Sequence, residues 1–152
     1  AALAEEMAEQ GHEIVVDLVK RGSWRGQAGW DTALAIAKGY VTLWEDNWPL
    51  MRVLDLTAAE GDQRFRSIRV HLLNQVTVAL SDVISAQQVA GRQVDSIDPM
   101  ATAGVLVSML AHVAAHRYGF EFYGIRTADL EVSMAHILYT TVTGQKPPKQ
   151  RA

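Results

Sequence analysis

The chain has 152 residues, a length typical of one domain, and hydrophobic residues make up 49% of it, which excludes a disordered chain. It contains no cysteine, so disulfides and thiolate metal sites are excluded, and no apolar run approaches the roughly 20 residues that a membrane-spanning helix needs. The formal net charge of −3 argues against a surface that binds nucleic acid by itself. We expect a cytoplasmic protein without a membrane partner.

Apolar residues recur at helical spacing through the first half of the chain. Residues 1–20 form an amphipathic stripe, and the glycine-rich stretch "RGSWRGQAGW" that follows predicts a loop. Asp31 can cap a second helix over 31–47. Pro49 stands where a first-turn proline belongs, which predicts a short third helix that ends at Gly61.

The second half predicts three more helices. The longest spans 62–90, the next runs from 99 to about 123 with Asp98 as its cap, and the last spans 127–143. The polar, basic residues 144–152 predict a disordered tail. No stretch is a convincing strand, so the sequence predicts an all-α fold, a bundle of six helices.

Two histidines in "MLAHVAAHRYGFEFYG" lie on one helical face, because His112 and His116 are four residues apart. A zinc site needs three or four ligands, and Val113 stands where the metalloprotease pattern requires glutamate. The di-iron motif is matched once, by Glu9 and His12, where a bundle needs it twice. We therefore expect a packed histidine pair, no metal, no cofactor and no catalytic residue. A helical metal-binding protein or enzyme that uses the pair is the alternative.

The helix that contains these histidines is apolar on two sides, and the last helix is similar. A helix that is apolar all round is buried on both sides, so one side would face the core and the other a second subunit. This predicts a homodimer built from residues 99–143; a single larger core within a monomer is the alternative. The predicted interface residues are Met109, His112, His116, Phe120, Leu130, Met134, Ile137 and Thr141.

Three stretches resemble the C-terminal effector-binding and dimerisation domain of TetR-family transcriptional regulators. They are "YVTLWEDNWPLMRVLDLTAAEGDQRFRSIRVHL", "AGRQVDSIDPMATAGVLVSMLAH" and "ADLEVSMAHILYTTVTG". The second is similar to the family's loop that ends in Asp-Pro before its penultimate helix, and the third resembles the closing helix of actinobacterial members. The resemblance covers essentially the whole chain, and the order and spacing of the stretches are its most specific feature.

The resemblance implies a ligand-responsive regulator, which we expect to be a repressor. Residues 1–143 would be its effector-binding and dimerisation domain, with 1–20 as the helix that connects to an N-terminal helix-turn-helix domain. Because the chain begins at Ala1 within a helical pattern, we expect a fragment from which that DNA-binding domain is absent. Operator DNA would bind only through the absent domain. A helical dimerisation module without a ligand is a further alternative.

The predicted pocket lies among aromatic residues near the junction of the second and third helices. Gln75 interrupts an apolar face of the long helix, and a polar group there needs a ligand, a water molecule or a backbone group as its partner. Aromatic residues at helical spacing are also common in cores. The resemblance implies a small, largely apolar effector. The predicted ligand-binding residues are Tyr40, Trp44, Trp48, Met51, Leu72, Gln75, Val76, Val107, Leu110, Ala111 and Ala114.

Overall fold

The computed structural model describes the backbone of residues 2–150 and the side chains within that range, except those of residues 2–5, 7, 8, 54, 55, 57, 58, 64, 65, 68, 69 and 72. This part of the chain is all-helical, as predicted. Its helices are α1 (Ala2–Arg21), α2 (Gly26–Asp46), α3 (Trp48–Ala59), α4 (Gln63–Val89), α5 (Pro99–Ala115), α6 (Arg117–Phe122) and α7 (Thr127–Thr143). None of the described helices is long and apolar enough to cross a membrane.

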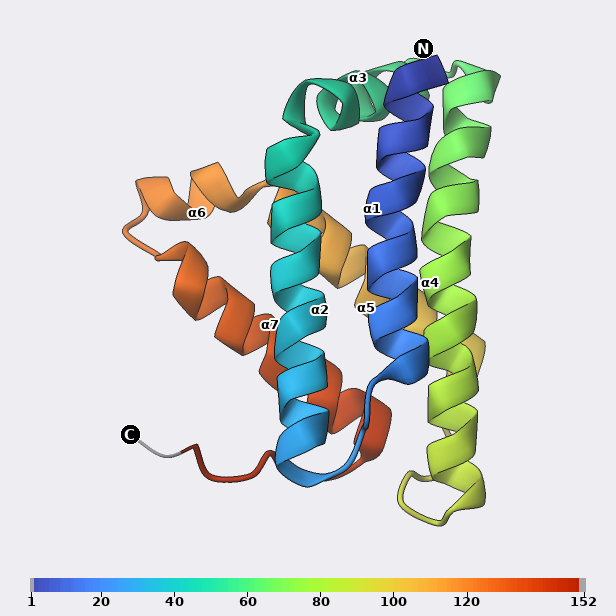
Figure 1. Ribbon diagram of the computed structural model, residues 1–152, viewed down its shortest axis with the longest axis vertical. Coiled ribbons are helices and arrows are strands. Elements are labelled where there is room, and N and C mark those ends of the chain that lie inside the picture. Colours follow the sequence, from blue (N-terminus) through green and yellow to red (C-terminus); the bar gives the residue numbers. More distant parts are fainter. Residues whose placement is uncertain (1, 151–152) are drawn as a thin grey trace.

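The helix α2 lies at the centre of the bundle, in contact with α1, α5 and α7 (Figure 1). α1 and α4 run beside each other, and α3 lies across one end of the bundle. α6 projects from the side of α2 that faces away from α1 and α4. Burial of apolar side chains holds α2 in place, because Ile36, Ala37 and Tyr40 are at most 1% exposed. Trp30 of α2 meets Tyr139 of α7 edge to face, with ring centroids 6.4 Å apart.

The start of α2 differs from the prediction. The helix begins at Gly26, so half of the stretch expected as a loop is helical, and Asp31 lies inside the helix instead of capping it. The glycines serve close packing here, since a Cβ at Gly29 would collide with the backbone of Trp24. The indole of Trp24 is buried and donates to the carbonyl of Val19 at 3.1 Å, which closes the short connection from α1.

The penultimate helix is divided, so the described chain has one helix more than the six predicted. Asp98 caps α5 as expected, accepting a hydrogen bond from the backbone N–H of Ala101 at 2.7 Å. The helix stops at His116, whose φ of −110° and ψ of 14° are not helical. The side chain of Arg117 turns inward there, and Gly119 weakens any continuation of the same helix.

The carboxyl end of α7 is joined to the loop between α4 and α5. Gly144 ends the helix with a φ of +68°, and Gln93 Nε2 donates to the carbonyl of Thr141 at 2.7 Å. Residues 145–150 form no helix, yet Gln145 Nε2 donates to the carbonyl of Arg92 at 3.1 Å. The disorder of residues 144–152 stays a prediction.

Candidate functional site

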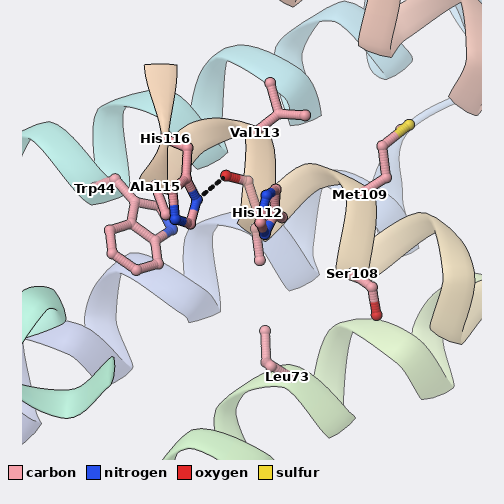
Figure 2. A pocket seen from close by; sticks show the side chains of 9 residues that line it. Trp44, Leu73, Ser108, Met109, His112, Val113, Ala115 and His116 are labelled. Atoms are coloured by element: carbon pink, nitrogen blue, oxygen red, sulfur yellow. Dashed lines mark hydrogen bonds between the residues drawn. The ribbon is translucent and has the colours of Figure 1, made fainter. Parts of the chain in front are cut away.

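A pocket of about 560 Å³ lies between α4 and α5, with α2 at one end. This volume is in the range of small-molecule binding sites. Trp44 of α2 and Leu73 of α4 border the pocket, and Figure 2 shows Leu73 on α4 across from α5. The α5 residues that line it are Ser108, Met109, Ala111, His112, Val113, Ala115 and His116.

The helix α5 separates the core from this pocket, which lies on the face that the two-sided pattern assigned to a second subunit. One face is buried, with Val107, Leu110 and Ala114 at most 2% exposed. A row of polar side chains on the other face borders the pocket. Four-residue spacing places the members of this row one above another along the helix, and they are Ser108, His112 and His116.

The two histidines of the row form a stack. The ring centroids of His112 and His116 are 4.1 Å apart, and the ring planes differ by 22°. His116 Nδ1 lies 2.9 Å from the carbonyl oxygen of His112, the contact drawn as a dashed line in Figure 2. Among the described residues, no three His, Asp or Glu side chains are close enough to hold a metal ion together. The pair thus forms an aromatic wall with nitrogen atoms at its edge.

Aromatic rings connect α2, α3 and α6 beside the pocket. Trp44 and Trp48 meet edge to face with centroids 6.4 Å apart, and Trp48 meets Tyr118 in the same manner at 5.5 Å. Edge-to-face pairs of this kind stabilise a fixed relative orientation of the rings. The cluster therefore fixes the position of the indole of Trp44 at the pocket.

Arg117 is a buried cation at the corner between α5 and α6. Its residue exposure is 3%, and Nη2 lies 3.2 Å from a carboxylate oxygen of Glu45 on α2. Nη2 also donates to the hydroxyl of Tyr118 at 2.7 Å, while Nη1 is buried and has no hydrogen-bond partner among the described residues. A buried charge needs such partners, so the contact with Glu45 ties the corner to α2.

The hydroxyl of Tyr40 is the second buried polar group without a partner in the described part of the chain. The residue is 1% exposed, and desolvation by burial raises the pKa of its hydroxyl above the ordinary tyrosine value. An unpartnered hydroxyl inside a core has an energetic cost. A bound molecule or an ordered water molecule would remove it.

The predicted effector residues separate into pocket and core. Trp44 and Ala111 line the pocket, and the half-buried Trp48 contacts the ring of Trp44. The side chains that instead pack in the core are those of Tyr40, Met51, Val76, Val107, Leu110 and Ala114.

Two predicted placements are wrong. Gln75 is exposed and lies 3.2 Å from the ring of His71, so it does not interrupt a buried apolar face. Met134 was expected on the outward face of the last helix, but it is 3% exposed and faces the core. Its neighbour Ile137, 45% exposed, does face outward. The side chain of Leu72 lies outside the described residues.

The other predicted interface residues lie at or near the surface. Three of them line the pocket, namely Met109, His112 and His116. Three more are half-buried, namely Phe120, Leu130 and Thr141. The pocket is therefore lined both by predicted ligand-binding residues and by predicted interface residues.

Sequence reasoning missed several lining residues. Leu73 comes from α4, and no local pattern indicates that it lines a pocket together with residues of α5. Ser108 carried a usable signal, because it continues the four-residue spacing of the two histidines toward the N-terminus.

A comparison with protein families identifies the chain. A family model of the tetracyclin repressor-like C-terminal domain matches residues 15–149. The comparisons with curated proteins and with solved structures give no match. The family match supports a transcriptional regulator of the TetR type rather than an enzyme. Since the matched span includes the C-terminal part of α1 and all of α2–α7, the chain belongs to the tetracyclin repressor-like C-terminal domain family.

Proposed function

We propose that this chain is the effector-binding and dimerisation part of a cytoplasmic, ligand-responsive transcriptional repressor. Residues 1–143 form that part, and DNA is bound by an N-terminal helix-turn-helix domain outside the given sequence. The effector is a small, largely apolar molecule that occupies the pocket between α4 and α5. Its binding changes the affinity of the dimer for operator DNA.

The observation that carries this proposal is the composition of the pocket. Its walls are mainly apolar, with an indole, a leucine and small aliphatic residues, and three polar side chains project from one helix. Small-molecule sites combine these two features, because apolar area provides affinity and a few polar groups provide orientation.

The outward faces of α5 and α7 form the proposed dimer surface. Val105 is 70% exposed on α5, and Val132 and Ile137 are 49% and 45% exposed on α7. A twofold axis brings the same apolar patch of two subunits together and removes it from water. Because Met109 and His112 belong both to the pocket and to the predicted interface, the effector would bind at the edge of the subunit contact.

A route from the pocket to the DNA-binding domain follows from the position of α1. This helix packs against both α2 and α4, which contribute Trp44 and Leu73 to the pocket. A ligand that separates α4 from α5 would therefore move the support on which α1 rests. Operator half-sites are about 34–36 Å apart, so a small tilt of α1 in each subunit is enough to disturb the fit.

A thermal-shift screen of small aromatic molecules tests the proposal. We expect compounds that raise the melting temperature of the chain, because a ligand that binds only the folded state stabilises it. The variant Ala115→Phe fills the pocket and should abolish these shifts, whereas Ala101→Phe, at an exposed position of α5 outside the pocket, should retain them. Shifts that persist in Ala115→Phe would contradict this pocket as the effector site, and their complete absence would favour a dimerisation module without a ligand.

A further inference from the structure

The hydrogen bond of His116 fixes which of its ring nitrogens carries the proton. Its Nδ1 lies 2.9 Å from the carbonyl oxygen of His112, and a carbonyl oxygen can only accept. Nδ1 is therefore the donor, and in the neutral ring Nε2 has no proton and presents a lone pair. The imidazole of His116 is thus a positioned hydrogen-bond acceptor at the pocket.

The hydroxyl proton of Ser108 is also used in a hydrogen bond within the helix. Its Oγ donates to the carbonyl oxygen of Gly104 at 2.8 Å, the usual bond of a helical serine to the preceding turn. A hydroxyl oxygen that donates its proton keeps two lone pairs with which it can accept. Figure 2 shows Ser108 and His116 on the same side of α5, with His112 between them along the helix.

The remaining wall of the pocket adds apolar surface and one donor. Trp44 contributes an indole N–H, which can only donate, and this ring lines the same pocket as the imidazole of His116. The other lining residues except His112 are aliphatic or Met109, and none of the described lining residues is Asp, Glu, Lys or Arg. A charged group of the ligand would therefore lose its hydration without a fixed counter-charge.

We propose that the pocket takes an uncharged aromatic molecule with a hydroxyl group, whose O–H donates to Nε2 of His116. A hydroxyl both donates and accepts, so it can donate to the acceptor of His116 while it accepts from a donor of the same pocket such as the indole of Trp44. The aromatic body lies against the imidazole stack and the indole. This assignment rests on the proposed function of the pocket and adds the chemical class of the effector.

The test compares two probes that differ in one proton donor, 1-naphthol and 1-methoxynaphthalene. Isothermal titration of the chain at neutral pH should show that 1-naphthol binds about tenfold more tightly, since an unsatisfied acceptor is left when the ether binds. The variant His116→Phe keeps an aromatic ring that can stack on His112, but this ring has no hydrogen-bond acceptor. In this variant, 1-naphthol should bind as weakly as the ether. The control His71→Phe changes an exposed histidine outside the pocket and should keep the preference.

Each outcome separates this inference from the proposed function. Equal binding of the two probes to the wild-type chain would overturn the hydroxyl assignment and leave a small-molecule pocket in place. A preference that survives in His116→Phe would place the acceptor elsewhere and also overturn it. Binding of neither probe would overturn the assignment together with the use of this pocket by aromatic molecules. If the wild-type chain prefers 1-naphthol and Ala115→Phe binds neither probe, the result supports the assignment at this site.

Discussion

Two unpartnered polar atoms stand out at the residue scale, the hydroxyl of Tyr40 and Nη1 of Arg117. Each belongs to a nearly fully buried side chain, at 1% and 3% exposure. The two differ in their surroundings, because Arg117 has Glu45 and Tyr118 as partners for its other nitrogen while the Tyr40 hydroxyl has none among the described residues. Substitutions at the two sites should therefore affect stability in different directions.

Tyr40→Phe removes a buried hydroxyl that makes no hydrogen bond to the described part of the chain. We expect the free energy of unfolding to rise by about 1 kcal/mol, because the cost of the unsatisfied group disappears. Tyr118→Phe is the matched comparison, since it deletes a hydroxyl that accepts from Arg117, and it should lower the free energy by about 1 kcal/mol. Urea unfolding measures both changes. A destabilised Tyr40→Phe would show that the hydroxyl has a partner, such as an ordered water molecule.

The same residue gives a pH dependence. Burial raises the pKa of Tyr40 in the folded chain, so the folded state keeps a proton that the unfolded state loses above about pH 10. Below that pH both states are protonated and the group contributes no pH dependence, whereas above it stability falls by up to about 1.4 kcal/mol per pH unit. Urea unfolding between pH 9 and 11 should show a smaller alkaline loss for Tyr40→Phe than for the wild type. Equal slopes would contradict the burial of this hydroxyl.

Glu45→Ala should weaken the corner between α5 and α6. The guanidinium of Arg117 is 4% exposed and would lose its carboxylate, while the half-exposed position of Glu45 lets water compensate in part. We expect the free energy of unfolding to fall by about 2 kcal/mol, seen as a lower urea midpoint at an unchanged slope. Asp46→Ala, at the next and exposed position of α2, should change stability by less than about 0.5 kcal/mol. Similar effects of the two variants would argue against a stabilising pair.

At the scale of elements, the end of α7 depends on the backbone of Gly144. Its φ is +68°, and a Cβ there would collide with the carbonyl oxygen of Arg92. Gly144→Ala should therefore cost about 1–3 kcal/mol. Gly104→Ala, in the middle of α5 with no atom within 4 Å of the added Cβ, should gain about 0.5–1 kcal/mol. Thermal unfolding of both variants checks the difference in sign.

The elements also show which parts of the fold the sequence could predict. Helical periodicity and the Asp98 cap predicted the position of most helices, because these signals are local. The start of α2 was missed, since three nearby glycines favour a loop until the packing of Trp24 against Gly29 is known. The break at His116 was missed for a similar reason, as it accompanies the contact between Arg117 and Glu45, which are 72 positions apart in the sequence.

The candidate site was only partly predictable. A helical projection separated the buried face of α5 from the face of its histidines, but the buried face, which the resemblance assigned to the effector cavity, packs in the core. It failed for Met134, since α7 is apolar on two sides and a projection does not say which of them meets α2. The combination of Trp44, Leu73 and the α5 row depends on how three helices pack together, and no local pattern records that arrangement.

At the scale of the whole molecule, the pocket and the proposed subunit contact share a helix. α5 presents its buried face to α2 and α4 and its outward face to the pocket and the proposed partner. A molecule bound beside His112 and His116 would therefore act on the bundle and on the dimer together. In the proposed dimer, this arrangement would connect effector binding to the relative orientation of the two subunits, which is what a regulator bound to a twofold operator requires.

The mass of the chain in solution tests the central claim, a dimer through the outward faces of α5 and α7, most directly. Light scattering at tens of micromolar should give twice the mass of one chain, and moderate salt should not dissociate it, because apolar burial drives the association. Ile137→Glu should give the mass of a monomer, whereas Ile14→Glu, at an exposed position of α1, should remain dimeric. A wild-type chain with the mass of a monomer at this concentration, or an Ile137→Glu variant that is still fully dimeric, would contradict the account.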